Sequence, residues 1–451
     1  MLLVLLSASS CYAGLGAYLI IDNVTTQDIT LNDGGSSCLV NSDALKNIQI
    51  APNQASNIYI EASTTGDCLL HGGIARGLLA LTATNSSGQA SVAYTLSTLS
   101  SSASSVLKSN NLPYSITTDH ASSLHNAEIV IRVTPNSEQS QVYSNWMGTL
   151  STNPQFANQK LAQTLLPGSH DSFSYGLTSA DICNTDPNAL SWLKIVGAMG
   201  LNWSMAQPNN SNFMQNTFIN QLNHGVRYFD VRLCYQNNTN FNSHNYLTHD
   251  SFEQNIAELT NFSSAHPQEI IILDLNHAYG FDSTSMSNLL DYLHQNYANI
   301  IVPFTQANPG MTLQQLWALH KNLIIILPSQ QADVNFDYLR NNPRFTWVWP
   351  STTINSPWPD LTDYPQLLSF AEQQLLKRNQ NQLFVSQLQQ TPSLDYILEN
   401  LRSSLFALNY ASLQAAYSWL KNNEAAVNIY IRDYEDAYEG VNLNLLRFGF
   451  E

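Results

Sequence analysis

Ionisable side chains recur where short apolar segments of the chain end. "LLPGS" is followed by His170 and Asp171, "YFDVRL" carries Asp230 and Arg232, and "NYLTH" ends at His249. "IIILDLNH" carries Asp274, Asn276 and His277, and "IYIRDY" carries Asp433. One histidine near the end of a strand is commonly structural, but ionisable groups at so many segment ends predict a shared reactive site.

Two histidines, an arginine and several carboxylates suit the cleavage of a phosphodiester without a metal. Because the unperturbed pKa of histidine is about 6.5, one imidazole can begin neutral as a general base and the other protonated as a general acid. An arginine offers phosphate oxygens a permanent charge and two parallel hydrogen bonds. A carboxylate behind a histidine fixes its tautomer and stabilises the imidazolium that forms.

Some of these residues also fit structural roles. Asp171 is a predicted substrate-binding residue, but its side chain equally suits a cap on the segment that follows. We also predict substrate binding for Asp274, Asn276 and His277, although the last two equally suit hydrogen bonds that hold loops. Three tryptophans are interpreted as core and rim packing, although aromatic rings at the mouth of a barrel would suit a lipid interface: Trp347, Trp349 and Trp358.

The elements that must position these residues change in character along the chain. Residues 17–136 contain short alternating segments such as "NIYIEAS" and "AEIVIRVTP", which predict an all-β sandwich. Residues 137–160 have no clear period and are predicted to be a linker. In residues 161–451, apolar runs alternate with helical stretches, which predicts a TIM-type (β/α)8 barrel, somewhat distorted. Reactive groups of such barrels lie at the carboxyl ends of the strands.

Eight segments are candidate strands of this barrel. In chain order they are "LAQTLLPGS", "RYFDVRL", "NYLTH", "EIIILDLN", "NLIIILP", "FTWVWP", "QLFVSQL" and "VNIYIRDY". Helical segments such as "SMSNLLDYLHQNY" lie between several of them.

Composition excludes one large class of partners. The chain has 451 residues, a formal charge of −16 and only 17 Lys and Arg residues, so a nucleic-acid partner is not expected. Hydrophobic residues make up 44% and charged residues 11%, which is typical of a globular protein.

The N-terminal segment and the cysteines both predict export. Residues 1–13 read as a signal peptide, although no basic residue follows Met1. The four cysteines beyond it are predicted from their proximity to pair as Cys38 with Cys68 and Cys183 with Cys234, and four free buried thiols are the alternative. No cysteine or histidine cluster has zinc spacing. We therefore expect a secreted, extracellular protein.

The ordered series of blocks carries a family resemblance. "LPGSHDS", "HGVRYFDVRL", "HPQEIIILDLNHAYG", "FTWVWPSTTINSPW" and "VNIYIRDY" resemble the phosphatidylinositol-specific phospholipase C X-domain family, in its small, metal-independent and bacterial-type branch. The resemblance covers residues 161–451. It implies cleavage of phosphatidylinositol-type lipids, or of glycosyl-inositol anchors, to diacylglycerol and an inositol cyclic phosphate. It also implies a phospholipid or phosphoinositol substrate and transient contact with a membrane surface.

The resemblance implies a role for each matching residue. His170 matches the general base that acts on the inositol 2-hydroxyl, and Asp433 matches the aspartate that backs it. Asp230 and Arg232 match the acidic residue and the arginine of the second strand. In the metal-independent branch this arginine stands where the large eukaryotic enzymes hold calcium. No metal or other cofactor is therefore expected.

The second histidine departs from the family pattern. The family has His-Gly after an apolar strand, whereas "FNSHNYLTHDSF" offers His244, followed by Asn245, or His249, followed by Asp250. We favour His249 as the general acid, because "NYL" supplies a strand before it. Spacing from Arg232 favours His244, which remains the alternative. The missing glycine bears on substrate range, since glycine lets the backbone approach a ligand closely.

Two other functions stay open. A metal-dependent glycerophosphodiester phosphodiesterase would need an acidic ligand set, and Arg232 argues against it. A non-catalytic scaffold that binds lipid or carbohydrate would explain the altered residue after the second histidine, but not the complete set of histidine, arginine and aspartate.

Overall fold

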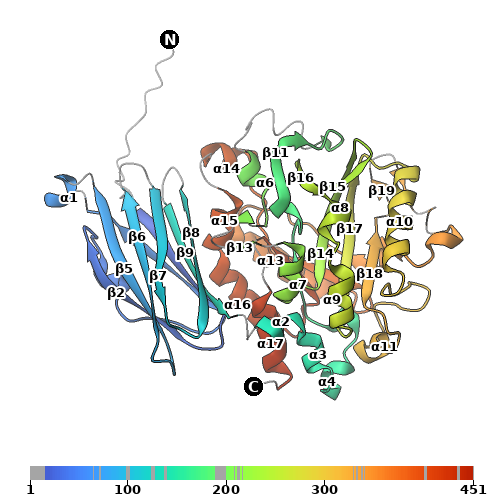
Figure 1. Cartoon of the computed structure of the whole chain (residues 1–451), viewed down its shortest axis with the longest axis horizontal. Helices are drawn as coiled ribbons and strands as arrows, with labels where there is room; N and C mark the ends of the chain where they lie inside the picture. Colours follow the sequence, from blue (N-terminus) through green and yellow to red (C-terminus); the bar gives the residue numbers. More distant parts are fainter. Residues whose placement is uncertain are drawn as a thin grey trace, which may run out of the picture.

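The structure is a computed structural model. It describes residues 16–63, 65–70, 73–97, 102–122, 127–136, 140–187, 200–207, 209–210, 214–215, 217–328, 330–331, 334–336, 339, 341–400, 404–433 and 437–449. The predicted signal peptide lies outside these residues. Figure 1 shows a β-rich part at the left and a mixed α/β part at the right.

The first part, residues 16–135, contains two sheets. One has the strand order β4 (Gln54–Glu61), β1 (Gly16–Asn23), β9 (Ala127–Pro135) and β8 (Tyr114–Ser122). The other has the order β3 (Ile48–Ile50), β2 (Ile29–Ser37), β5 (Ile74–Ala83), β6 (Gln89–Ser97) and β7 (Ser102–Asn110). Residues from both sheets form a single buried apolar cluster. We refer to this part as the β region.

The second part is built on one path of eight parallel strands. The path runs β22 (Ile354–Asn355), β23 (Leu383–Gln387), β24 (Ile429–Arg432), β10 (Leu166–Ser169), β14 (Tyr228–Gln236), β17 (Ile271–Tyr279), β18 (Leu323–Leu327) and β21 (Trp349–Pro350). In the described residues, no strand pairing joins β21 to β22, so the path does not close. The mixed α/β class is confirmed, whereas the closed barrel is not.

Seven of the eight candidate strands lie in this parallel path, and one does not. "NYLTH" belongs to β16 (Tyr246–Ser251), which pairs antiparallel with β15 (Thr239–His244) and with β11 (Leu177–Ile182). β15 in turn continues antiparallel from β14. The remaining parallel strand, β22, was not predicted, because it is only two residues long and contains no apolar run.

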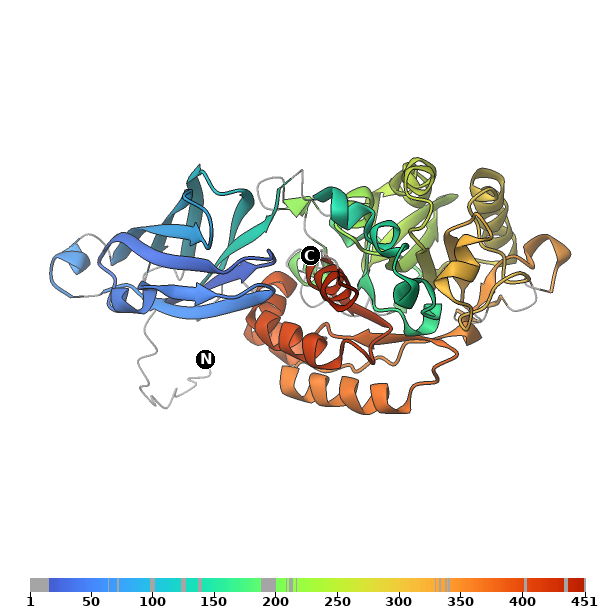
Figure 2. The ribbon, with the colours of Figure 1, turned by 90° about the horizontal axis from the view of Figure 1, so that it is seen from below.

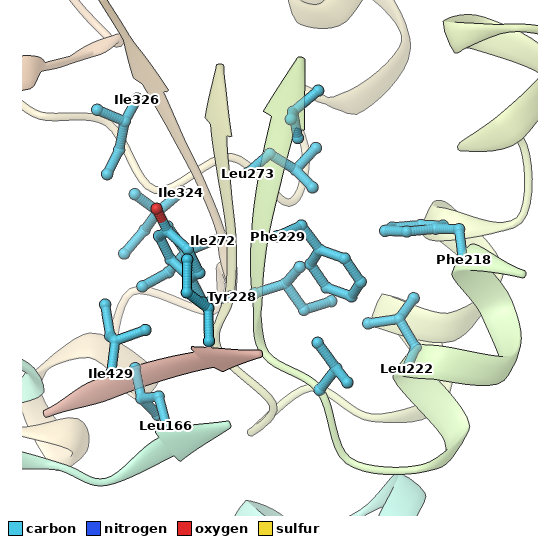
Figure 3. Packing of buried hydrophobic residues seen from close by; sticks show 14 of the residues in the cluster. Leu166, Phe218, Leu222, Tyr228, Phe229, Ile272, Leu273, Ile324, Ile326 and Ile429 are labelled. Carbon is cyan, nitrogen blue, oxygen red and sulfur yellow. The ribbon is translucent and has the colours of Figure 1, made fainter. Parts of the chain in front are cut away.

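Apolar packing on both faces holds the parallel strands in place. β18, "LIIIL", is buried at every position, as expected for a central parallel strand. Figure 3 shows Tyr228 of β14 on the same side as Ile272 and Ile324, while the next residue, Phe229, faces Phe218. The Phe218 and Phe229 ring centroids are 4.7 Å apart. Alternation along β14 therefore sends one face inward and the other to a covering helix.

Helices lie on the outside of the sheet and over the carboxyl ends of its strands. They are α6 (Gly200–Ser204), α7 (Phe218–Asn223), α8 (Phe252–Asn255), α9 (Leu259–Ala265), α10 (Ser283–Tyr297), α11 (Leu313–Trp317), α13 (Tyr364–Lys377), α14 (Leu394–Glu399), α15 (Leu405–Ala411), α16 (Leu413–Asn423) and α17 (Tyr438–Arg447). In α10, Asp282 and Ser285 form a capping box, and the buried residues recur at helical spacing from Met286 to Tyr297. Among the described helices, none combines the length and apolar content needed to cross a bilayer.

The segment predicted as a linker is mostly helical. It contains α2 (Ser140–Ser144), α3 (Trp146–Leu150) and α4 (Pro154–Ala157). Trp146 and Phe156 are fully buried in the same cluster as the core of the α/β part. Figure 2 shows the C-terminal helices, in red, lying between the β region and the rest of the α/β part.

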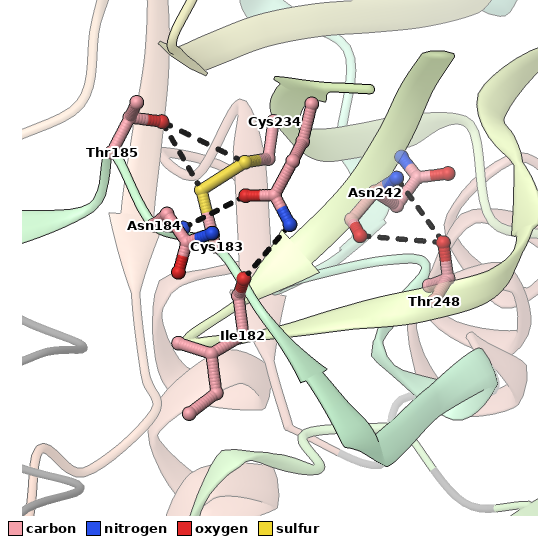
Figure 4. The surroundings of a disulfide bond; sticks show 8 residues. Ile182, Cys183, Asn184, Thr185, Cys234, Asn242 and Thr248 are labelled. Atoms are coloured by element: carbon pink, nitrogen blue, oxygen red, sulfur yellow. Dashed lines mark hydrogen bonds between the residues drawn. A yellow bond between two sulfur atoms is a disulfide. The ribbon is translucent and has the colours of Figure 1, made fainter. Parts of the chain in front are cut away.

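Two disulfides close local loops, and the predicted pairing is confirmed. Cys38, beside β2, pairs with Cys68 of α1 (Asp67–Leu70), and Cys183 pairs with Cys234. The second bond ties the end of β11 to β14 (Figure 4). It therefore braces the antiparallel extension against the strand that carries Asp230 and Arg232.

Candidate active site

The turn after β10 places His170 between the ends of β24 and β14. Gly168 in β10 has no room for a side chain, because a Cβ there would lie 2.8 Å from the Tyr228 ring. The His170 N–H donates to the Arg432 carbonyl at 3.3 Å, and Gln207 Nε2 donates to the His170 carbonyl at 2.8 Å. The backbone of His170 is thereby held from two directions.

The His170 ring has a carboxylate on one nitrogen and a guanidinium on the other. His170 Nδ1 lies 2.7 Å from Asp433 Oδ1, and Nε2 lies 3.0 Å from Arg232 Nη2. The carboxylate accepts a hydrogen bond from Nδ1–H, and the guanidinium donates one to Nε2, so these partners assign the neutral tautomer with hydrogen on Nδ1. That tautomer leaves Nε2 as the basic nitrogen.

Asp171 contacts three of the charged or titratable side chains of the site, although the sequence around it equally suited a helix cap. Its carboxylate lies 2.5 Å from Arg232 Nε, 3.1 Å from His244 Nδ1 and 3.5 Å from His170 Nε2. The contact with Arg232 is an ion pair that lacks hydrogen-bond alignment. Asp171 also has a φ of 41°, an uncommon left-handed conformation for a residue other than glycine. Its place at the centre of the charged groups shows that it is more than a cap.

Asp230 supports this arrangement from β14. It accepts hydrogen bonds from the Asp171 N–H at 3.1 Å and from Asn276 Nδ2 at 2.9 Å, and it lies 3.7 Å from Arg232 Nε. The Asn276 side-chain amide thus donates to Asp230. His170 Nε2 is 3.8 Å from Asp230, so Asp433 is the carboxylate that orients the histidine.

Two further predicted substrate-binding residues lie beneath the charged groups. Asp274 is buried and accepts a hydrogen bond from the Tyr228 hydroxyl at 2.7 Å. His277 stands opposite Arg232 in the register of β17 and β14. Burial raises the pKa of Asp274 to about 7, and burial together with Arg232 lowers the pKa of His277 to about 4. Neither residue is among those that line the pocket described below.

The structure brings His244, and not His249, to His170. The His170 and His244 ring centroids are 6.3 Å apart, and His244 Nδ1 donates to the Ser204 carbonyl at 2.6 Å. The His249 side chain is 84% exposed and pairs with Asp250. The preference for His249 is corrected, because the antiparallel turn from β15 to β16 points His244 inward. "NFNS" before it does form a strand, β15.

A pocket of about 300 Å³ opens over these groups. It is lined by His170, Trp203, Arg232, His244, Asn245, Trp358, Gln390, Thr391, Pro392, Ile397, Leu405 and Asp433. The general-base candidate, the arginine and the second histidine therefore share one concave surface with apolar and amide side chains, as expected for a small-molecule site.

The two histidines have pKa values displaced in opposite directions. Burial lowers the pKa of His170, but Asp171 and Asp433 outweigh it, so the net pKa is raised. Burial lowers the pKa of His244, Arg232 and His170 add to this, and Asp171 only partly opposes it. Although burial raises the pKa of Asp230, Arg232 and His170 bring it to about 2, so this carboxylate stays charged.

The acidic groups also make a possible metal site. His170, Asp171 and Asp230 each offer a ligand atom, and these atoms lie within 4.8 Å of one another. However, Arg232 Nε lies 2.5 Å from Asp171 and 3.7 Å from Asp230. A divalent cation would have to bind against this guanidinium, so the donor set fits a metal poorly.

Sequence patterns did not reveal three residues around the pocket. Trp203 Nε1 is buried and has no hydrogen-bond acceptor among the described residues. Ser204 holds His244 through its carbonyl, and Asn245 Nδ2 donates to Ser204 Oγ at 3.0 Å. Trp203 and Ser204 lie on the short helix α6, which carries no charged residue and no clear period. No signal in the sequence would have located them.

Curated proteins similar to this chain have one family name in common. PI-PLC X domain-containing protein 2 of Mus musculus is 28% identical over 306 residues, which is 65% of this chain and 84% of that protein. Its Homo sapiens counterpart is 29% identical over 271 residues, 58% of this chain and 82% of that protein. PI-PLC X domain-containing protein 3 of Bos taurus is 26% identical over 308 residues, 65% of this chain and 89% of that protein.

The chain is a relative of the PI-PLC X domain-containing proteins. The resemblance seen in the sequence blocks is therefore confirmed. No protein-family model matches the chain.

Two solved structures are also similar to this X-domain relative. A mutant of the phosphatidylinositol-specific phospholipase C from Staphylococcus aureus has a TM-score of 0.46 and 17% identity, covering 67% of this chain and 96% of that chain. The phosphatidylinositol-specific phospholipase C from Listeria monocytogenes has a TM-score of 0.44 and 18% identity, covering 67% of this chain and 98% of that chain.

Proposed function

We propose that this chain is a secreted phosphodiesterase that cleaves phosphatidylinositol-type lipids, or glycosyl-inositol anchors, by metal-independent general acid and base catalysis. The products are diacylglycerol and an inositol cyclic phosphate. The observation that carries the proposal is one pocket lined by His170, Arg232, His244 and Asp433. The relatives' names, which contain PI-PLC, support the substrate class.

His170 is the general base. With hydrogen on Nδ1 and Asp433 behind it, Nε2 accepts the proton of the inositol 2-hydroxyl, which then attacks phosphorus. In the free protein Arg232 donates to this same nitrogen at 3.0 Å. A bound phosphate attracts the guanidinium more strongly than a neutral imidazole does, because the hydrogen bond is then between two charged groups. Substrate binding thus turns Arg232 to the non-bridging oxygens and exposes Nε2.

His244 is the general acid. Its Nδ1 is held by the Ser204 carbonyl and by Asp171, so Nε2 is the nitrogen available to protonate the glycerol oxygen as it leaves. The lowered pKa of His244 disfavours the protonated form in the free protein. A phosphodiester anion bound beside it raises that pKa, because the opposite charge stabilises the imidazolium. The acid is therefore charged when the substrate is present.

The remaining lining residues bear on binding. Trp203 contributes a buried indole N–H that has no acceptor within the described part of the chain, and we assign it to a phosphate oxygen or a hydroxyl of the substrate. Trp358 is 58% exposed at the same pocket and suits transient contact with a membrane surface. We assign residues 17–136 to an accessory β-sandwich, and residues 161–451 to a distorted barrel that holds the site.

Export is supported by two observations. Residues 1–13 have the pattern of a signal peptide. Both disulfides, Cys38–Cys68 and Cys183–Cys234, suit an oxidising compartment.

The test is the release of inositol cyclic phosphate from phosphatidylinositol in mixed micelles with excess chelator, for wild type and His170→Ala. We expect wild-type turnover to survive the chelator and the variant to lose about 10²–10⁴-fold. Turnover that requires added calcium would favour the metal-dependent alternative, for which the cluster of His170, Asp171 and Asp230 is the supporting observation. No turnover under either condition would refute the proposed substrate.

A further inference from the structure

The β region contacts the two helices that flank the last parallel strand. Strand β24, which leads to Asp433, is preceded by α16 and followed by α17. From α16, the side chain of Gln414 accepts a hydrogen bond from the Ala55 N–H at 2.7 Å. From α17, Asn442 Nδ2 donates to Asn53 Oδ1 at 2.8 Å. Both helices that flank the strand leading to Asp433 therefore contact the β region, and Figure 1 shows α16 beside that region.

A buried ion pair lies on the β region's side of this contact. Asp22 of β1 and Arg132 of β9 stand opposite each other in neighbouring strands, with Arg132 Nε 2.6 Å from Asp22 Oδ2. Both side chains are at most 1% exposed. The other oxygen of Asp22 accepts a hydrogen bond from the Tyr417 hydroxyl of α16 at 2.9 Å. The Asp22 carboxylate of the β region therefore binds the Tyr417 side chain of the α/β part, which is 395 residues away in the sequence.

Tyr417 in turn contacts the end of β24. The Arg432 guanidinium carbon lies 5.3 Å from the centroid of the Tyr417 ring, in a cation–π arrangement, and Arg432 Nη2 lies 3.6 Å from Glu439 of α17. Arg432 immediately precedes Asp433, and its carbonyl accepts the backbone N–H of His170. Movement of Arg432 would therefore move both members of the pair formed by His170 and Asp433.

We propose that Tyr417 is a positioning residue: held by Asp22 of the β region, it fixes Arg432 and, through it, the Asp433 carboxylate that orients His170. The β region is then an integral support of the reactive groups and not an independent binding module. The effect on catalysis rests on the proposed function, whereas the effect on His170 does not. Four buried charges, Asp22, Arg132, Arg432 and Glu439, balance to zero, which makes their burial tolerable.

The pKa of the His170 ring depends on where the Asp433 carboxylate lies, so it can be used to test this positioning role. Charged and titratable groups face it from its own turn, from β14, from β15 and from the end of β24: Asp171, Asp230, Arg232, His244 and Asp433. Of the three carboxylates Asp171, Asp230 and Asp433, the last is nearest to the ring and stabilises the imidazolium. If Asp433 moves away, the His170 pKa falls.

The experiment is an NMR titration of ring-labelled histidines in the full chain, comparing Tyr417→Phe with wild type and with Tyr297→Phe. His170→Gln identifies the resonance. Tyr297 is a matched control on α10, since it is also buried and its hydroxyl donates to the Ile256 carbonyl at 3.2 Å. We expect the His170 pKa to fall by about half a unit in Tyr417→Phe, a fraction of the effect of a neighbouring carboxylate. Tyr297→Phe should leave it unchanged.

Activity on phosphatidylinositol provides the second readout. We expect kcat to fall about 10-fold in Tyr417→Phe with KM nearly unchanged, because misplacing a base affects the chemical step. A folded Tyr417→Phe protein with the wild-type His170 pKa would overturn the inference. If this variant does not fold, Arg432→Lys is titrated instead, and an unchanged His170 pKa there overturns it equally. A lowered pKa in a protein that turns over no substrate would support the inference and refute the proposed function.

Discussion

Replacement of the second histidine separates the general acid from its alternative. His244→Ala removes the side chain that lines the pocket beside His170, whereas His249→Ala removes one that is 84% exposed. We expect His244→Ala to lower kcat on phosphatidylinositol by about 10²–10⁴-fold, the range for loss of a general acid. This corresponds to about 2.7–5.4 kcal/mol of transition-state stabilisation. His249→Ala should retain wild-type turnover.

The size of the effect depends on the leaving group. A glycerol alkoxide must be protonated as it departs, but a nitrophenolate leaves readily without a proton. We therefore expect His244→Ala to lose most of its deficit when a nitrophenyl inositol phosphodiester replaces the lipid. His170→Ala, which lacks the base, should stay impaired on both substrates because the attacking hydroxyl is unchanged.

The assay follows cyclic phosphate release from the lipid and nitrophenolate absorbance from the chromogenic substrate, each with purified variants of equal thermal stability. Equal losses for His244→Ala and His249→Ala would refute the assignment. A deficit in His244→Ala that is just as large on the nitrophenyl substrate would show that His244 binds or positions the phosphate instead of protonating the leaving oxygen.

Three further predictions follow from the geometry. Asp433→Asn keeps the shape of the side chain that lies 2.7 Å from His170 Nδ1, but the amide no longer stabilises the imidazolium. We therefore expect kcat to fall by up to about 10⁴-fold and the acidic limb of the pH profile to move to lower pH. An unchanged acidic limb would contradict this. Trp203→Phe keeps an aromatic side chain, although a smaller one, and removes the indole N–H, so it should raise KM for the lipid about 10-fold in initial-rate assays. An unchanged KM would show that no substrate atom accepts from this N–H. Burial raises the pKa of Asp274 from 3.8 to about 7, so between these pH values the folded state holds a proton on Asp274 that the unfolded state has lost. The free energy of unfolding therefore falls as pH rises from about 4 to 7, by up to about 1.4 kcal/mol per pH unit. Asp274→Asn should flatten this part of the curve in urea unfolding measured from pH 4 to 7, and an identical slope would refute the origin assigned to it.

Most of the parallel strands could be recognised because their signal is local. Runs such as "EIIILDLN" and "NLIIILP" are apolar throughout, and burial on both faces requires this of a central parallel strand. β22 was missed because two residues show no period. "NYLTH" was misassigned because an antiparallel strand, β16 between β11 and β15, can carry the same apolar residues as a parallel one.

The candidate site was predictable to the extent that it follows strand ends. His170, Asp230, Arg232 and Asp433 lie where the strands β10, β14 and β24 bring them together. Trp203 was not predictable, because α6 enters the pocket only through long-range packing. The role of Asp171 depends on a left-handed backbone conformation that its sequence neighbours do not specify.

The sequence by itself indicated the family and the mixed α/β class, and it led to a prediction of the disulfide pairs and of the residue types at the site. These features follow from residue types and from their order along the chain, which can be read without knowing any distance between residues. Tertiary structure alone decided that His244 faces His170, that Asp171 joins both histidines to Arg232, and that Asp22 reaches Tyr417. Each of these depends on the direction of a side chain after distant segments pack, because burial and hydrogen bonding, not sequence separation, select that direction.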